Sequence, residues 1–378
     1  MTRETVLITG GAGFIGSHLA DAYLRAGYAV RVLDSCDPQV HRAVGGALWR
    51  PDYLSPDVEL VRGDVRDRDA VARALRGVSI LSHHAAAVGV GQSMYEIERY
   101  VSVNTLGAST VLDVVVNERV PLRKMIVASS MSVYGEGVYR NTVTGAHVHA
   151  ELRPASQLER RCWDPLDESG NPMPPIPTPE DTSTKPASVY ALTKRDHEDL
   201  FLLIGRTYGI PTVALRYFNV FGPRQALTNP YTGAAAIFCS RLLAGQRPVV
   251  FEDGGQLRDF VSVHDVADVN LIVSDHQAAD DQVFNIGSGS RIAVRELATK
   301  LARALRVEQE PDITNTYRVG DVRHCFADTA KAGRLLGWQA REDVDSRSEE
   351  LVEWVSRQLV EDRADEMKAE LQRRGLAR

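Results

Sequence analysis

The sequence is poor in the cysteine patterns that mark metal sites and disulfide frameworks. Its four cysteines, Cys36, Cys162, Cys239 and Cys325, are widely scattered, and none belongs to a CxxC pair. Structural zinc sites and disulfide-rich folds depend on paired or regularly spaced cysteines. We therefore expect no metal and no disulfide, and a cytoplasmic location, because reduced cysteines suit that compartment.

Long apolar runs and an excess of positive charge are also missing. No run of about 18 apolar residues is present, so we expect no membrane-spanning helix, and no signal peptide precedes the first apolar run. The formal net charge of −6 disfavours non-specific binding to nucleic acid. A local basic pocket for an anionic ligand remains compatible with this charge.

The chain has enough hydrophobic material for one large domain or two smaller ones. It has 378 residues, of which 44% are hydrophobic. Apolar runs alternate with helical patterns, which predicts a doubly wound parallel α/β sheet of the Rossmann type. The predicted strands are residues 5–9, 29–33, 58–62, 78–83, 124–128 and 212–217, and the predicted helices between them are 13–27, 67–75, 104–117 and one that begins near 188.

The second half of the pattern is less regular. We predict a dinucleotide-binding domain over 1–218, interrupted by a proline-rich excursion at 136–185 with little periodicity. Such a long loop is either a functional segment near the active site or a surface insertion. Residues 219–378 are predicted to form a smaller α/β lobe that returns to the sheet near 260–286. Its expected elements are helices 234–244, 294–305 and 346–373, and short strands at 249–251 and 260–261.

A glycine turn joins the first strand to the first helix. Gly10, Gly13 and Gly16 follow the strand that ends at Thr9 and open a helix through Phe14 and Ile15. Glycines in this context let the backbone approach a pyrophosphate, which faces the helix N-terminus. The pattern therefore predicts a dinucleotide site.

Acidic and small residues after the next strands extend this prediction. Asp34 closes the second strand, where a carboxylate can accept hydrogen bonds from both ribose hydroxyls and would repel a 2′-phosphate. Asp34 therefore favours NAD over NADP, whereas the positive charge of Arg31 would favour NADP. Further candidate cofactor contacts are Asp64, Val65, Ala85 and Ala86, after the third and fourth strands. His84 is as readily explained as a structural polar residue.

Tyr190 and Lys194 form a candidate proton-transfer pair. They are four residues apart, and this spacing places both on one face of a helix. A nearby ammonium and a positive nicotinamide ring would favour the phenolate, so Tyr190 could act as a general base. Lys194 would also hold the nicotinamide ribose. Ser130, at the end of the fifth strand, could hydrogen-bond the reacting oxygen, and Ser129 is a competing candidate one residue away.

These motifs together resemble the extended short-chain dehydrogenases/reductases, in particular the NAD-dependent nucleotide-sugar epimerase/dehydratase family. Further matching segments are Leu215–Arg224, Arg258–Ala267 and Phe284–Ser288. The resemblance implies a catalytic role for Ser130, Tyr190 and Lys194, with bound NAD. It also implies a nucleotide-diphosphate sugar substrate and a homodimer built from helices near 88–117 and 190–206. The substrate residues that it implies are Ser132, Asn219, Arg224, Phe251, Arg258 and Arg323.

One departure from the family pattern narrows the expected reaction. Dehydratases of this family carry an Asp-Glu pair directly after the catalytic hydroxyl residue, whereas this chain has Met131 and Ser132. The leading hypothesis is therefore inversion of C4 of the sugar through a transient 4-keto intermediate. The segments 231–238 and 250–254 most resemble epimerases of dTDP-6-deoxysugars such as dTDP-L-rhamnose. Alternatives are a UDP-glucose or UDP-glucuronate 4-epimerase, an NADH-dependent 4-ketoreductase and a non-catalytic NAD-binding scaffold.

Overall fold

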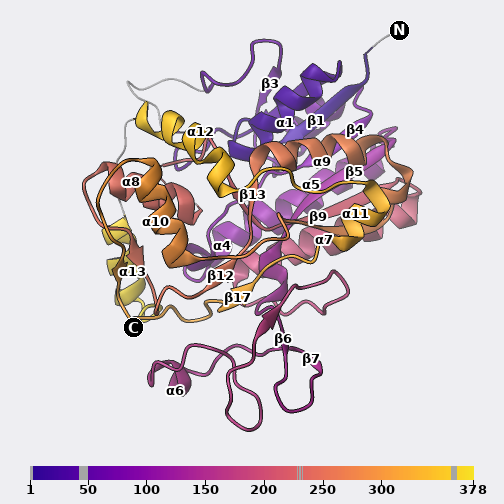
Figure 1. Cartoon of the computed structure of the whole chain (residues 1–378). Coiled ribbons are helices and arrows are strands. Elements are labelled where there is room, and N and C mark those ends of the chain that lie inside the picture. Colours follow the sequence, from indigo (N-terminus) through magenta and orange to yellow (C-terminus); the bar gives the residue numbers. More distant parts are fainter. Residues whose placement is uncertain (1–2, 42–49, 228, 230, 232, 359–363) are drawn as a thin grey trace.

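The computed structural model describes residues 3–41, 50–227, 229, 231, 233–358 and 364–378. A seven-stranded parallel sheet runs through its centre in the order β14-β9-β5-β4-β1-β2-β3 (Figure 1). In chain order these strands are β1 Thr5–Thr9, β2 Ala29–Asp34, β3 Glu59–Arg62, β4 Ile80–His83, β5 Lys124–Ser130, β9 Thr212–Tyr217 and β14 Gln282–Ile286. The predicted sheet is confirmed.

Helices cover both faces of this sheet. On one face, α1 (Phe14–Arg25) packs beside α9 (Val263–Asp275), with Leu19 and Val269 in their shared core. On the other face lie α2 (Arg68–Leu75), α5 (Gly107–Asn117) and α7 (Val189–Tyr208). The carboxyl ends of the parallel strands therefore open between two helical layers, where ligand clefts of such sheets lie.

The helix predicted over 104–117 begins later than expected. α5 starts at Gly107 and follows two short helices, α3 (Val90–Ser93) and α4 (Ile97–Tyr100), and a wider π-helical turn at Val101–Leu106. This turn carries Asn104, whose side chain accepts a hydrogen bond from Ala87 N and donates to Ala87 O and Thr193 Oγ1. The two bonds to Ala87 hold the irregular turn against the loop after β4, and the bond to Thr193 holds it against the helix that spans Val189–Tyr208.

The excursion at 136–185 is folded, although its sequence predicts little regular structure. It forms an antiparallel sheet of β6 (Val138–Arg140), β7 (His147–His149) and β8 (Pro175–Ile176), with α6 at Ala155–Leu158. Tyr139, Ala150 and Met173 make a small core of its own. In Figure 1 it projects beneath β12 and β17.

The C-terminal lobe packs three helices around a separate core. These are α8 (Ala234–Leu243), α10 (Val294–Ala304) and α12 (Val344–Ser356). Short strands complete it: β10 Asn219–Phe221, β11 Val249–Val250, β12 Leu257–Arg258, β13 Phe260–Ser262, β15 Ile292–Ala293, β16 Asp312–Ile313 and β17 His324–Cys325. The helix α11 (Ala330–Leu336) packs instead on the main-sheet core, where Ala332 and Leu336 are buried. From β13 the chain returns to the main sheet through α9 and β14.

The single helix predicted over 346–373 is wrong. α12 ends at Ser356, and a second helix, α13, spans Ala364–Arg373. Val355 is buried in the lobe core, whereas α13 packs at a different place, near the C-terminus in Figure 1. The two helices bury their apolar faces against different neighbours: Val355 of α12 in the lobe core, and Leu371 of α13 against Gly91.

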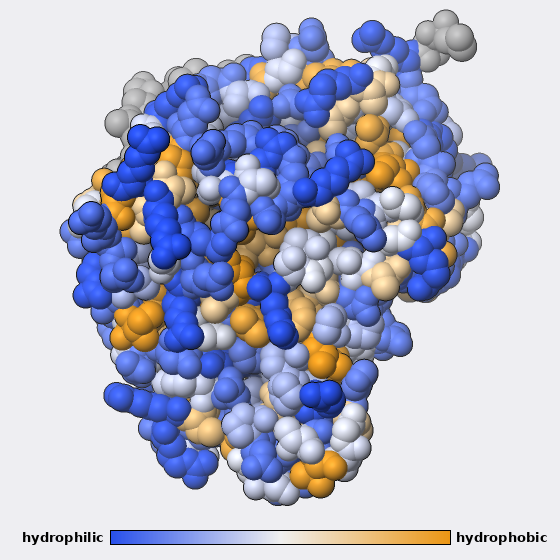
Figure 2. Space-filling view, in the orientation of Figure 1, coloured by the Kyte–Doolittle hydropathy of each residue, from blue (hydrophilic) through white to orange (hydrophobic). Residues whose placement is uncertain are grey.

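The visible surface is mainly polar. Hydrophilic side chains dominate the face in Figure 2, and hydrophobic ones occur singly or in small groups. Within the described residues, no helix is both long and apolar enough to cross a bilayer.

Candidate active site

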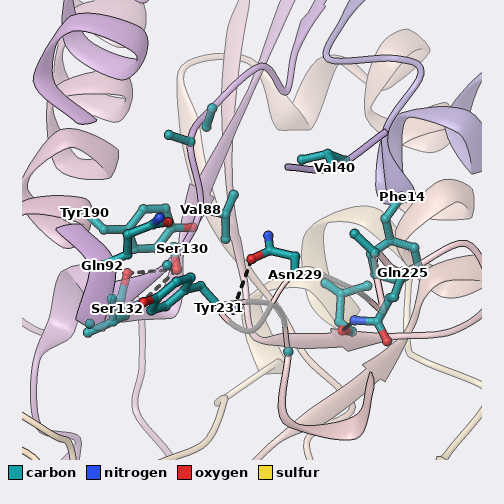
Figure 3. Close-up of a pocket in the computed structure, with 18 of the residues that line it drawn as sticks. Phe14, Val40, Val88, Gln92, Ser130, Ser132, Tyr190, Gln225, Asn229 and Tyr231 are labelled. Carbon is teal, nitrogen blue, oxygen red and sulfur yellow. Dashed lines mark hydrogen bonds between the residues drawn. The ribbon is translucent and has the colours of Figure 1, made fainter. Parts of the chain in front are cut away.

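A cavity of about 660 Å³ lies along the carboxyl ends of the sheet strands and continues into the C-terminal lobe. Figure 3 shows Phe14, Val40 and Gln225 at one side and Gln92, Ser130, Ser132 and Tyr190 at the other, with Asn229 and Tyr231 between them. All predicted cofactor residues line this cavity: Gly10, Gly13, Phe14, Ile15, Gly16, Asp34, Asp64, Val65, Ala85, Ala86 and Lys194.

The glycine turn is shaped by two close backbone approaches. Gly10 has φ +69°, and a Cβ there would lie 2.8 Å from Ala85 Cα. A Cβ on Gly16 would lie 2.4 Å from Gly10 O. Gly13 begins α1 without a side-chain cap, so the first amides of the helix are free to bind an anion. The turn is therefore a cradle that a larger residue would fill.

Two carboxylates flank this cradle. Asp34 accepts a hydrogen bond from Ala12 N at 3.0 Å, which ties the end of β2 to the glycine turn, and a local one from Cys36 N at 2.9 Å. Asp64 instead forms a fork with Arg66, whose hydrogen bond holds the pKa of that carboxyl below its usual value. Asp34 thus faces the cavity from a fixed position, and Asp64 is already paired.

Tyr190 and Lys194 lie one turn apart on α7, as their spacing predicts. Ser188 caps the helix by accepting a hydrogen bond from Ala191 N, and this places both side chains at the cavity. Lys194 Nζ donates to Ala128 O at 2.9 Å. Burial lowers the pKa of Lys194 to about 7, and burial raises the pKa of Tyr190 to about 12, against a hydrogen bond with Ser130. A cation brought near Tyr190 would lower that pKa.

The two competing serines have different surroundings. Ser129 Oγ donates to Glu198 Oε2 at 2.8 Å, inside a buried cluster that also holds Arg216. Ser130 Oγ accepts from Ser132 Oγ at 2.9 Å and lies beside Tyr190 (Figure 3). The geometry therefore favours Ser130 as the hydroxyl that meets a reacting oxygen.

Three predicted substrate residues from the lobe side reach the cavity together with Ser132. They are Asn219, Phe251 and Arg258. Asn219 Oδ1 is buried without a hydrogen-bond partner among the described residues, so it is available to a ligand. The Arg258 guanidinium donates to the main-chain carbonyls of Leu257, Val322 and Arg323, which fix its orientation at the cavity wall.

Arg224 and Arg323 lie elsewhere. Arg224 pairs with Asp21 at 2.8 Å and stacks over the Tyr53 ring. Arg323 is buried and pairs with Asp164 at 2.8 Å, Glu252 at 2.9 Å and Asp253 at 2.7 Å. Among the described residues, neither arginine is part of the cavity wall. Both side chains join structural ion pairs.

Arg318 is a cavity residue that the sequence analysis missed. Its guanidinium lies 4.8 Å from the centre of the Phe251 ring and pairs with Asp321 at 2.7 Å. Gly320, at φ +78°, forms the turn that lets Asp321 fold back on Arg318. The glycine in Arg318-Val319-Gly320-Asp321 predicts a turn, but nothing local in the sequence distinguishes this arginine from a surface one.

The excursion contributes to the site indirectly. No residue of 136–185, all of which the structure describes, lines the cavity. Its Arg153 pairs with Glu252 at 2.9 Å, and its Asp164 pairs with Arg323. These contacts fasten the excursion behind the Phe251 segment instead of over the active site.

A family model described as "NAD dependent epimerase/dehydratase family" matches residues 6–157 and 167–287. The chain belongs to this family. The match spans the glycine cradle, Ser130, Tyr190, Lys194 and Arg258.

Curated relatives of this family extend over nearly the whole chain. A dTDP-L-rhamnose 4-epimerase of Burkholderia thailandensis is 35% identical over 92% of this chain and 94% of its own length. A putative UDP-glucose 4-epimerase of Methanocaldococcus jannaschii is 30% identical over 90% of this chain and 94% of its own length. Sequence similarity therefore includes the C-terminal lobe.

Solved structures give the same result. The UDP-glucose 4-epimerase of Thermotoga maritima with UDP-glucose has a TM-score of 0.74 at 28% identity, covering 93% of this chain and 98% of that one. The Thermus thermophilus UDP-glucose 4-epimerase in complex with NAD has a TM-score of 0.70 at 28% identity, covering 94% and 100%. The glycine cradle, the free amides of α1 and Asp34 fit NAD, which is the cofactor of the family.

Proposed function

We propose that this protein inverts C4 of a nucleotide-diphosphate sugar through a 4-keto intermediate, with a dTDP-6-deoxyhexose as the favoured substrate. The observation that carries the reaction is the buried group of Ser130, Tyr190 and Lys194 beside a dinucleotide cradle. The similarity to the dTDP-L-rhamnose 4-epimerase, 35% identical, supports the substrate class.

The catalytic side chains have separate roles in this proposal. Tyr190 takes the proton of the C4 hydroxyl and later returns it, while Ser130 hydrogen-bonds the same oxygen. Lys194, when protonated, lowers the pKa of Tyr190 and binds the nicotinamide ribose. Bound NAD supplies the reversible oxidation of the C4 carbon.

The lobe holds the substrate while its sugar turns. Asn219, Arg258 and Arg318 offer an amide and two guanidinium groups from one side of the cavity, and guanidinium groups suit diphosphate oxygens. Binding through the diphosphate leaves the sugar free to present either face of C4. Met131 and Ser132 provide no carboxylate for elimination of water, so we propose epimerisation over dehydration.

The test is to supply dTDP-L-rhamnose, UDP-glucose and UDP-glucuronate separately without added NADH and to follow the C4 epimer by NMR. An epimerase restores its cofactor in each cycle, so product should form with no net change in absorbance at the NADH wavelength. Product that forms only from a 4-keto sugar with stoichiometric NADH would establish the ketoreductase instead. A protein that binds NAD and converts none of these sugars would support the non-catalytic scaffold.

A UDP-sugar is the second candidate substrate. The structures that resemble this chain at 28% identity include an enzyme solved in complex with UDP-glucuronic acid and NAD, and one solved with UDP-glucose. The kcat/KM values for the three nucleotide sugars in the NMR assay show whether the enzyme prefers a dTDP-sugar or a UDP-sugar.

We also propose that the protein is a cytoplasmic homodimer. None of the four cysteines forms a disulfide within the part of the chain that the structure describes. Ile97, Leu106, Leu192 and Leu203 are each about half exposed, on the segment around α4 and on α7, which pack together. Exposed leucines and isoleucines gathered on neighbouring helices favour self-association. Light scattering should give twice the chain mass, and Leu203→Glu should shift it toward the monomer.

A further inference from the structure

The last helix, α13, carries a face that belongs to the substrate cavity. Ala364, Met367, Lys368 and Leu371 line the cavity, and their spacing of three, four and seven residues places them on one side of the helix. Three of these side chains are apolar and one is a lysine. The opposite side, including Glu366, Ala369 and Arg373, is exposed. The helix therefore presents an apolar wall with a single cation.

Contacts on both halves of the molecule fix α13 in this place. On the lobe side, Asp365 pairs with Arg241 of α8 at 3.1 Å. On the side of the dinucleotide-binding domain, the Arg374 guanidinium lies 4.2 Å from the centre of the Tyr95 ring. Leu371 packs against Gly91, where a Cβ would come within 3.3 Å of the leucine side chain. The helix thus bridges the two halves across the cavity.

The residues after α13 also bear on the cavity. Tyr317 N donates to Arg378 O at 2.7 Å, and Arg378 N donates to Tyr317 O at 2.9 Å. Val319 N donates to Leu376 O at 2.9 Å. These bonds lie on either side of Arg318, the cation that stacks on Phe251. The end of the chain therefore supports Arg318 as well as α13.

Lys368 differs from the other cations near it. Arg241 is paired with Asp365, and Arg318 is paired with Asp321. Lys368 is half-buried and forms no hydrogen bond or ion pair with any residue that the structure describes. A cation held at a cavity wall without a carboxylate partner is suited to an anionic ligand.

We propose that α13 is a wall of the substrate site and that Lys368 binds the diphosphate of the nucleotide sugar. This assignment rests on the proposed function and adds a specific contact to it. Met367 and Leu371 cover the same side of the ligand with apolar surface. Lys368 then adds a third cation to Arg258 and Arg318 on the wall of the same cavity.

Calorimetry on the NAD-bound protein tests the contact without turnover. The probes are dTDP, UDP and the corresponding nucleosides, and the variants are Lys368→Met, Lys368→Arg and the control Arg373→Met. Arg373 lies on the exposed side of the same helix and pairs with Glu370. We expect Lys368→Met to weaken binding of the diphosphates about tenfold and to leave nucleoside binding unchanged, since a charge-assisted bond is lost. Lys368→Arg should retain most of the affinity, and Arg373→Met all of it.

Two results would overturn the assignment. Unchanged diphosphate affinity in Lys368→Met would remove Lys368 from the site. Equal weakening of nucleoside and diphosphate binding would show that Lys368 maintains the shape of the cavity wall and does not contact the phosphates. In turnover assays, Lys368→Met should raise KM with kcat within about twofold. Failure of the proposed epimerisation is distinguishable, because the wild-type protein would then bind dTDP or UDP and yet form no C4 epimer.

Discussion

The dinucleotide-binding domain and the C-terminal lobe supply their shares of the cavity in different ways. In the domain, β1, β2, β4 and β5 end at one edge of a parallel sheet, so the residue that follows each strand lines the cavity. In the lobe, Phe251, Arg258 and Arg318 come from loops and two-residue strands. Short sequence motifs are therefore sufficient in the first region, whereas long-range contacts decide the second.

Arginines show what this difference means for interpreting a sequence. Arg258, Arg318 and Arg323 all lie in the lobe, but Arg323 is turned away from the cavity. It pairs with Asp164 of the excursion, with buried Glu252 and with Asp253. A guanidinium suits a carboxylate as well as a phosphate. Its role is therefore set by the partners that the fold places near it.

The largest expected effect tests the strand-edge region. Tyr190→Phe should lose at least about 10²-fold in kcat, because it removes the proton-transfer group. NAD should remain bound, since the glycine cradle is untouched. Steady-state kinetics and mass spectrometry of the released cofactor measure the two outcomes. Near-normal turnover would mean that another group transfers the proton.

Two arginine variants test whether Arg323 stabilises the lobe while Arg318 binds the substrate. Arg323→Leu should lower the free energy of unfolding by about 3 kcal/mol, because it leaves buried Glu252 without one of its partners. Arg318→Gln should leave stability nearly unchanged and raise KM about tenfold, since Arg318 faces the cavity. Urea denaturation and kinetics on both variants separate the roles. A raised KM in Arg323→Leu with normal stability would show that Arg323 binds the substrate.

Cofactor choice tests Asp34. The wild-type protein should bind NAD at least about tenfold more tightly than NADP, because the carboxylate repels a 2′-phosphate. Asp34→Asn should bring the two affinities close together. Calorimetric titration of cofactor-free protein gives both constants. Equal affinities for the wild-type protein would show that Asp34 only ties β2 to the glycine turn.

The last prediction concerns the buried amino group of Lys194. Its pKa is lowered to about 7 in the folded chain, whereas an exposed lysine titrates near pH 10.4. Between these values the unfolded chain holds a proton that the folded chain lacks, so raising the pH favours the folded state. Stability should rise by up to about 1.4 kcal/mol per pH unit between pH 7.5 and 9.5, relative to Lys194→Met. The measurement is the free energy of unfolding of the cofactor-free wild-type protein and of Lys194→Met as a function of pH. The same pH dependence in both proteins would contradict the prediction.

Local signals account for the part of the fold that sequence analysis predicts well. The strands at 5–9 and 212–217 have the predicted limits, and α7 carries Tyr190 and Lys194 on one face. The break between α12 and α13 has no comparable signal, because charged residues continue through both helices and only their separate packing distinguishes them. The excursion is similar: its small core of Tyr139, Ala150 and Met173 joins residues far apart in sequence.

The candidate substrate residues also fall into two groups, those that a local motif places correctly and those that long-range partners hold elsewhere. Asn219 and Arg258 lie in the cavity as their motifs indicate. Arg224 does not, since it meets Asp21 of α1 and the ring of Tyr53. In the segment 231–238, Thr232 lies outside the described residues, while Tyr231 lines the cavity and its hydroxyl meets that of Tyr95.

By itself, the sequence determined the parallel sheet, the glycine cradle, Asp34 and the Tyr190–Lys194 pair. These depend on contacts within a few residues and on the rule that parallel strands end at one edge. Three features could be known only from the folded chain: the hydroxyl of Ser130 meets Tyr190 whereas that of Ser129 is bonded to Glu198, Arg318 takes the place predicted for Arg323, and α13 forms one wall of the cavity. Each of these depends on partners more than 50 residues away, whose positions no local pattern specifies.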